Sequence, residues 1–242
     1  MIERLGRHVS GYDLSMPDSA PDIPPETAPD SAPDTRRTAP VDSLLALAIG
    51  HVNAGRREQA RAVCALAQSI HPAHPAVLQL LALLALQDGD SQAARRCAEA
   101  SLALRPGHSP TLLLAGQAQH ACGALHAALH SFEQLAATTP RDPQAWFQIA
   151  LVRQDLRDLH GAEAALQRVL QLAPRRADAL VNLGIVLQEQ GQLDAALQAY
   201  GRAYVLREDT FGRIAHALVS ASVGRLWLDL DALRATLRGA AA

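Results

Sequence analysis

A period of 34 residues organises most of this chain and limits the folds that it can adopt. Proline recurs at this interval as Pro72, Pro106, Pro140 and Pro174. Small residues recur at the same interval on two predicted helices, as Ala48, Ala82, Gly116, Ala150 and Gly184 and as Ala60, Ala94, Ala128, Ala162 and Ala196. The turn between these helices carries Gly55, Gly89, Gly123 and Gly191, with Arg157 as the exception. Such self-similarity indicates stacked copies of one supersecondary unit.

The stretch from Pro143 to Pro174 shows how one unit is expected to fold. Its pattern predicts two short amphipathic helices in antiparallel contact, with Ala150 and Ala162 where the two backbones come closest. Pro174 cannot extend a helix and therefore begins the next unit. Because a single hairpin cannot bury its own apolar face, the unit requires neighbours of the same kind.

The same stretch resembles a tetratricopeptide repeat (TPR). The residues that carry the resemblance are Trp146, Ile149 and Ala150 on the first helix, Ala162, Leu166 and Val169 on the second, and the closing Pro174. Phe132 and Tyr200 also match the family, whereas the usual Trp is replaced in the other units by Leu44, Leu78, Leu112 and Leu180. The resemblance implies an all-α fold, a right-handed α-solenoid of five TPR helix hairpins with a C-terminal capping helix pair.

The period also predicts the domain organisation. Residues 1–40 hold half of the 14 prolines and cannot bury enough apolar area to fold, so we expect a disordered tail rich in Pro, Asp and Ala. This tail is a tether or spacer, or it carries a short docking element from Leu5 to Leu14. Residues 41–208 are expected to form the five repeats, at 41–74, 75–108, 109–142, 143–176 and 177–208. Helices are predicted near 42–54, 57–71, 76–88, 91–105, 110–122, 125–138, 178–190 and 193–206.

The period breaks after Glu208, and residues 209–242 are expected to form a helical C-terminal cap. A helix to about Val223 and a last amphipathic helix at about 229–237 would cover the apolar face of the final repeat, as solenoids require. Trp227 between them is interpreted as the anchor of the cap, or as a contact in a homodimer or with a partner, because Trp is enriched at interfaces.

The composition argues against several classes of function. The 22 basic residues are all Arg and are balanced by 24 carboxylates, so we expect no nucleic-acid partner, and the lack of Lys suggests a bacterial coding bias. No stretch has the length and apolar purity of a membrane span, and no secretory signal is visible, so no membrane association is expected. Three scattered cysteines indicate reduced thiols, which favours a cytoplasmic location.

The resemblance implies a binding surface on the concave side, which the first helices of TPR hairpins line. At the matching positions the fifth and ninth places of the repeats form an apolar stripe flanked by amides, a pattern that usually marks a protein contact. The expected partner-binding residues are Leu45, Ile49, Gln79, Leu83, Leu113, Gln117, Phe147, Gln148, Leu151, Gln154, Val181, Asn182, Ile185, Gln188 and, at the cap, Trp227. Glutamate at Leu83 and Leu151 is expected to abolish binding without unfolding the chain. Coverage of this stripe by the N-terminal tail or by tight packing is the alternative.

No catalytic motif is visible, and we expect neither an enzyme activity nor a cofactor. His126 and His130, one helical turn apart and close to Glu133, have a spacing that zinc accepts, but solvent-facing histidines are common on second helices, so no metal site is expected. The sequence therefore predicts a protein-binding scaffold, adaptor or assembly chaperone that holds an apolar or amphipathic segment in its groove. The alternative is a non-catalytic subunit of an enzyme complex, such as a glycosyl-, sulfo- or methyltransferase or a peptide-modifying enzyme.

Overall fold

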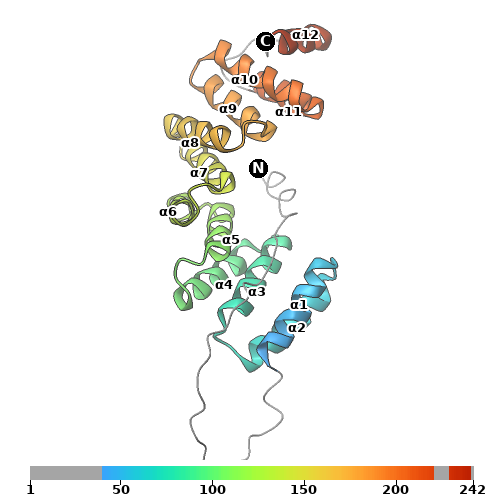
Figure 1. Ribbon diagram of the computed structural model, residues 1–242, viewed down its shortest axis with the longest axis vertical. Helices are drawn as coiled ribbons and strands as arrows, with labels where there is room; N and C mark the ends of the chain where they lie inside the picture. The colour runs from blue at the N-terminus through green and yellow to red at the C-terminus, as the bar shows by residue number, and fades with distance from the viewer. Residues whose placement is uncertain (1–39, 221–228, 241–242) are drawn as a thin grey trace, which may run out of the picture. The chain divides into compact units, whose positions relative to one another are not determined.

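The computed structural model describes residues 40–220 and 229–240, and every regular element in these ranges is a helix (Figure 1). The elements are α1 (Val41–Asn53), α2 (Arg57–Ile70), α3 (Pro75–Gln87), α4 (Ser91–Leu104), α5 (Ser109–Ala121), α6 (Leu125–Thr138), α7 (Pro143–Asp155), α8 (Leu159–Leu172), α9 (Ala177–Glu189), α10 (Leu193–Leu206), η2 (Glu208–Thr210), α11 (Phe211–Ser220) and α12 (Leu230–Ala240). The prediction of an all-α fold is confirmed. The helices predicted before residue 208 each begin and end within one residue of the observed bounds.

The chain divides into two compact units, one within Met1–Cys122 and the other within Gly123–Ala242. The first contains α1 to α5, and the second contains α6 to α12. Within the first unit α1 packs on α2 and α3 on α4, and within the second α7 packs on α8 and α9 on α10. Each of these pairs is a helical hairpin closed by a short turn.

The turns of the hairpins require a left-handed backbone, which explains the recurring glycine. Gly55, Gly89, Gly123 and Gly191 all have positive φ values, between 70° and 81°. Arg157, the exception in the sequence, adopts the same conformation with φ 64°. An L-residue is strained there because its Cβ approaches the following carbonyl oxygen. The turn geometry is therefore kept in this hairpin even without glycine.

The small residues of the period are buried. Ala60, Ala94, Ala128, Ala162 and Ala196 are each 0% exposed, and Ala48, Ala82 and Ala150 are at most 2% exposed. Gly184 approaches its partner helix so closely that a Cβ there would lie 2.4 Å from the ring of Tyr200. Close approach of α9 and α10 therefore explains the glycine at this position.

The end of the second unit is closed by α12, which packs against α10. Leu233 and Leu237 of α12 are 1% and 0% exposed. The guanidinium of Arg234 lies 4.4 Å from the centre of the Phe211 ring, a stacking geometry that favours the docked helix. The helix predicted to run to about Val223 is present as α11, which follows η2, where the Thr210 hydroxyl donates to the Arg207 carbonyl. Its predicted end lies outside the described residues. Trp227 lies outside the described residues.

Candidate partner-binding surfaces

The structure divides the predicted partner-binding residues into a buried set and a partly exposed set. The buried residues are Leu45, Leu83, Phe147, Gln148, Val181, Asn182 and Gln188. The partly exposed residues are Ile49, Gln79, Leu113 and Gln117 in the first unit and Leu151, Gln154 and Ile185 in the second. Only the second set can meet a partner without a rearrangement of the helices. Trp227, as noted above, is not among the described residues.

Leu83 is a core residue of the first unit rather than an accessible part of a groove. It is 4% exposed and packs in a cluster with Ala98 of α4 and Leu114 and Ala115 of α5. A glutamate at this position would bury a charge among apolar side chains, which costs several kcal/mol. The expectation that Leu83→Glu tests binding without unfolding the chain is therefore wrong for this residue.

Two of the predicted amides bond within the protein. The side chain of Asn182 donates to the carbonyl oxygen of Asp178 over 2.9 Å, one turn earlier on α9. The Oε1 of Gln188 accepts a hydrogen bond of 3.0 Å from the hydroxyl of Tyr200. Buried amides need such partners, and these bonds give both residues a structural role.

A polar cluster that the sequence did not reveal covers Phe147. The Arg176 guanidinium lies 4.3 Å from the centre of the Phe147 ring and donates to the Gln144 amide oxygen over 2.8 Å. Its Nε also donates to Asp178 over 3.0 Å, so the guanidinium is fixed on three sides. This stacking leaves Phe147 only 3% exposed. The repeat position of Phe147 does not predict its burial by Arg176, because Arg176 precedes α9 and lies outside the helical positions that the family pattern covers.

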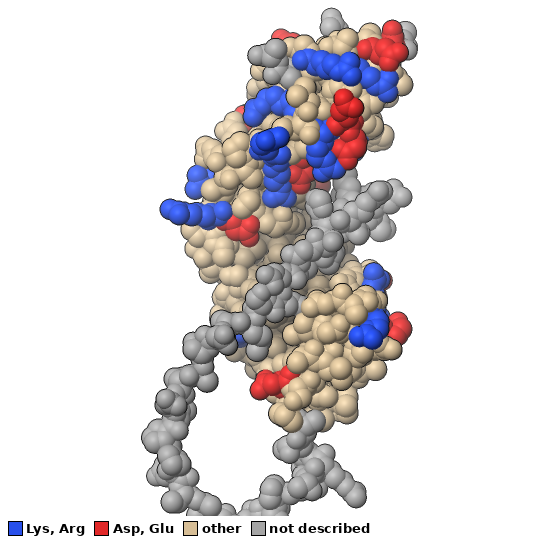
Figure 2. Space-filling view, turned by 45° about the vertical axis from the view of Figure 1, so that its right-hand side comes forward, with Lys and Arg blue, Asp and Glu red and all other residues tan. Residues whose placement is uncertain are grey.

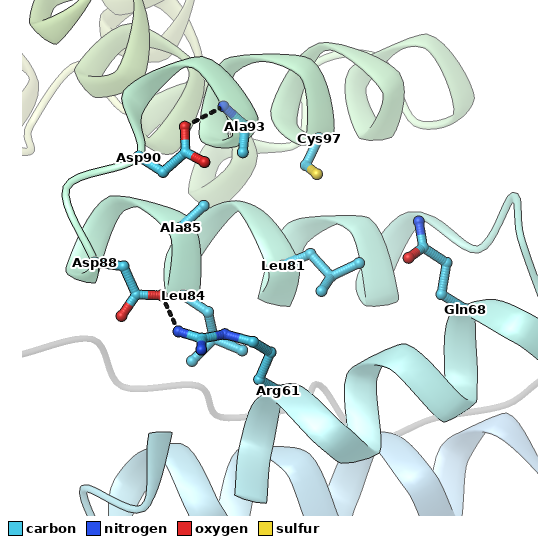
Figure 3. Close-up of a pocket in the computed structure, with 9 residues that line it drawn as sticks. All are labelled: Arg61, Gln68, Leu81, Leu84, Ala85, Asp88, Asp90, Ala93 and Cys97. Carbon is cyan, nitrogen blue, oxygen red and sulfur yellow. Dashed lines mark hydrogen bonds and ion pairs between the residues drawn. The ribbon is translucent and has the colours of Figure 1, made fainter. Parts of the chain in front are cut away.

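The first unit contains a cavity of about 420 Å³ between α2, α3 and α4 (Figure 3). Leu81, Leu84 and Ala85 of α3 line it together with Ala93 and Cys97 of α4. The remaining lining residues are Arg61 and Gln68 of α2, Asp88 at the end of α3 and Asp90 before α4. Figure 3 shows the charged side chains at one end of the cavity and the Gln68 amide at the other. Of the predicted partner-binding residues that the structure describes, none lines this cavity.

The charged end of the cavity is organised by internal hydrogen bonds. Arg61 pairs with Asp88, and this bond raises the pKa of the guanidinium above its ordinary value. One oxygen of Asp90 accepts from the Ala93 backbone N–H over 2.9 Å and so caps α4. Burial raises the pKa of the Cys97 thiol, which keeps it protonated and apolar in character at neutral pH. The cavity is therefore mainly apolar, with one cation and two carboxylates at its rim.

The histidines considered for zinc have other contacts. His130 Nε2 lies 2.9 Å from the Gln134 amide nitrogen, and Glu133 accepts from Arg153 over 3.2 Å. Among the described residues no group of three or more His, Cys, Asp or Glu side chains is placed to hold a metal ion. In the same part of the chain, no helix has the length and apolar character that crossing a membrane requires. On the face shown in Figure 2, arginines and carboxylates lie next to one another.

Comparisons with known proteins agree with the repeat fold. Residues 142–213 match the family model for the tetratricopeptide repeat, while no curated protein matches the chain. The structure of MamA from residue 41 onward, from Desulfovibrio magneticus RS-1, is 18% identical, with a TM-score of 0.67 over 72% of this chain and 98% of the other. TTC0263, a thermophilic TPR protein of Thermus thermophilus, is 24% identical, with a TM-score of 0.58 over 74% and 99% of the two chains. YrrB, a TPR protein with an unusual peptide-binding site, is 16% identical, with a TM-score of 0.65 over 73% and 90%. Residues 142–213 therefore match the tetratricopeptide repeat family, and the chain shares its helical fold with solved TPR structures.

Proposed function

We propose that this protein binds other proteins, and that the first helices of its hairpins hold a segment of the partner. The observation that carries the proposal is the exposure of apolar side chains at equivalent places of the second unit. Leu151 on α7 and Ile185 on α9 are 34 residues apart, and both remain partly exposed although most apolar neighbours are buried. Exposed apolar positions of this kind, with polar groups around them, favour a protein contact.

The polar surroundings indicate the chemistry of the partner segment. The Gln154 amide is partly exposed, and the nearby helix end carries an ion pair in which Arg157 lies 3.2 Å from Glu189. Amides and a neutralised ion pair suit the backbone and polar side chains of a bound amphipathic segment better than a highly charged one. The comparison with YrrB, whose description names a peptide-binding site, supports a peptide-like ligand for this fold. The role is that of a scaffold, adaptor or assembly chaperone without a catalytic step, and the cytoplasm is the expected location.

The experiment compares the proteins captured from the native host by the wild type and by a Leu151→Glu/Ile185→Glu variant. A matched control, Ala164→Glu/Gln198→Glu, places the same charges at exposed positions of the second helices α8 and α10. Circular dichroism verifies that all three chains fold alike. We expect a partner that is held by the wild type and the control and lost by the first variant.

Retention of the same partner by every variant would contradict the assignment of the contact to these first helices. A catalytic protein among the partners lost by the variant would identify the alternative role, a non-catalytic subunit of an enzyme complex. Only partners that the control variant still captures are counted in these comparisons. A partner lost because the chain unfolds is therefore not mistaken for one lost because the binding site is changed.

A further inference from the structure

The cavity of the first unit exists because one position of the repeat is small. The 34-residue period relates Ala85 to His51, Gln119, Arg153 and Leu187. Gln119 and Leu187 are each 7% exposed, and the Arg153 side chain is 29% exposed. These three larger side chains therefore fill the space beside their helices, whereas the methyl group of Ala85 leaves the corresponding space open.

The side chain of Arg153 shows what such a space can accommodate. Its methylene groups pack against α8, since a Cβ on Gly161 would lie 2.9 Å from the Arg153 Cδ. Its guanidinium reaches the Gly161 carbonyl over 3.4 Å and Glu133 over 3.2 Å, and its Nε lies 3.9 Å from Asp158. An arginine can therefore fill this space, with its methylene groups packed against apolar side chains and its guanidinium bonded to acceptors.

The open cavity keeps part of the acceptor set that Arg153 uses. By the same period Asp90 corresponds to Asp158 and Ala93 to Gly161. Asp90 caps α4 through one carboxylate oxygen, as Asp158 caps α8, with N–H···O distances of 2.9 Å in both. The charged residues that line the cavity are Arg61, Asp88 and Asp90, so one carboxylate exceeds the available cations. The rim is therefore complementary to a positive guest.

We propose that this cavity is a second binding site, which takes an arginine of a partner polypeptide together with an adjacent apolar side chain. The guanidinium bonds to Asp90 at the charged end, and the apolar side chain packs on Leu81 and Leu84. The volume of about 420 Å³ lies within the range of about 300–1,000 Å³ typical of ligand sites. In the fourth repeat, the absence of a side chain at Gly161 leaves room for the Arg153 methylene groups beside α8. At the equivalent position of the cavity, the methyl group of Ala93 occupies part of this room, so the guest lies over Leu81 rather than against α4.

This site is separate from the surface in the proposed function. The cavity is lined by α2, α3 and α4 of the first unit, whereas the proposed peptide contact uses the first helices of the second unit. Arginine is preferred over lysine because its planar guanidinium donates several hydrogen bonds in a fixed geometry, as Arg153 does to two acceptors. An acidic guest would be repelled by Asp90, the carboxylate in excess of the lining cations, because Asp88 is paired with Arg61.

The test is a titration of the ¹⁵N-labelled full chain, followed by NMR, with the peptide acetyl-Leu-Arg-Leu-Leu-amide. We expect saturable shifts of the Ala85, Ala93 and Cys97 amides. A peptide with citrulline in place of arginine has almost the same shape without the charge, and it is expected to bind at least about 10-fold more weakly. Equal binding of the two peptides, or shifts elsewhere only, would overturn the proposal.

Two substitutions connect the signal to the cavity. Ala85→Leu introduces the residue that the repeat itself has at Leu187, and it is expected to fill the space and abolish the shifts while the fold is kept. Ala100→Leu, at an exposed position of α4, is the matched control and should bind as the wild type does. Asp90→Asn retains a capping side chain but removes the charge, and should weaken the arginine peptide more than the citrulline peptide. Unchanged binding by Ala85→Leu would place the peptide elsewhere and refute the site.

Discussion

The hydroxyl of Tyr200 donates a hydrogen bond of 3.0 Å to the Oε1 of Gln188, and it does so in the interior of the hairpin formed by α9 and α10. Tyr200 and Gln188 are 0% and 1% exposed. Burial raises the pKa of the Tyr200 hydroxyl, which therefore stays protonated and remains a donor. The bond explains how a glutamine is accommodated beside the apolar core of the second unit.

Removal of this donor should destabilise the second unit. Tyr200→Phe leaves the buried Gln188 oxygen without its phenolic partner, and we expect the free energy of unfolding to fall by about 1–3 kcal/mol. Urea unfolding followed by circular dichroism measures this change. Tyr204→Phe is the comparison, because the Tyr204 hydroxyl accepts a hydrogen bond of 3.4 Å from the exposed Arg238. This variant should lose less free energy of unfolding than Tyr200→Phe. Equal losses of free energy of unfolding in the two variants would show that the hydrogen bond to Gln188 does not stabilise the second unit more than the bond to Tyr204 does.

Gly184 should not tolerate even a methyl group. A Cβ at this position would lie 2.4 Å and 2.5 Å from two carbons of the Tyr200 ring, which has no space to move in a packed core. Gly184→Ala is therefore expected to cost about 1–3 kcal/mol, as overpacking of cores does. Gly212→Ala, in α11 with no atom within 4 Å of its Cβ, should be neutral or gain up to about 1 kcal/mol. Thermal unfolding of both variants checks the difference, and a stable Gly184→Ala variant would contradict the close approach.

The elements that the sequence predicted well depend on the backbone. Helix bounds, the small residues between helices and the left-handed turns follow from proline, alanine and glycine, whose conformational limits are local. Even the exception, Arg157, occupies the turn that the period assigns to it. Such features do not depend on which side chains surround them.

The candidate site was harder to predict because exposure depends on neighbours from other helices. Leu83 and Phe147 hold family positions of a groove, but Leu83 lies in a cluster with α4 and α5 residues, and Arg176 covers Phe147. The cavity beside Ala85 was missed for the opposite reason, since a missing side chain leaves no motif. The sequence does contain a sign of the cavity, because the period aligns Ala85 with the larger residues Gln119, Arg153 and Leu187. This difference in size indicates a cavity only once the contacts of Arg153 show what fills the equivalent space.

Arg157 provides a site for a stabilising substitution. Its φ of 64° is unfavourable for any residue with a Cβ, whereas glycine adopts it at the four corresponding turns. Arg157→Gly is expected to raise the free energy of unfolding by about 0.5–1 kcal/mol, because the relief of strain exceeds the small value of the exposed ion pair with Glu189. The reverse change, Gly191→Ala, should lower it by about 1 kcal/mol. Destabilisation by Arg157→Gly in urea unfolding would show that the ion pair outweighs the strain.

Cys64 should make stability fall at alkaline pH. Burial raises the pKa of its thiol from 9.0 to about 11, and the side chain is 1% exposed. Between these values the unfolded chain has released the proton and the folded chain still holds it. Since stability rises with pH only where the unfolded state binds more protons, the free energy of unfolding must fall as the pH rises from 9 toward 11.

The Cys64→Ala variant isolates this contribution, because the other groups that ionise at high pH are the same in both chains. Urea unfolding at pH 8, 9.5 and 10.5 should show a loss of stability for the wild type that exceeds the loss for the variant, with the difference confined to the alkaline range. The variant is less stable at pH 8, where the buried thiol contributes packing as a small apolar group, so only the slope with pH is compared. Parallel slopes would mean that the Cys64 thiol titrates alike in the folded and unfolded chains, and therefore that α2 opens readily around it.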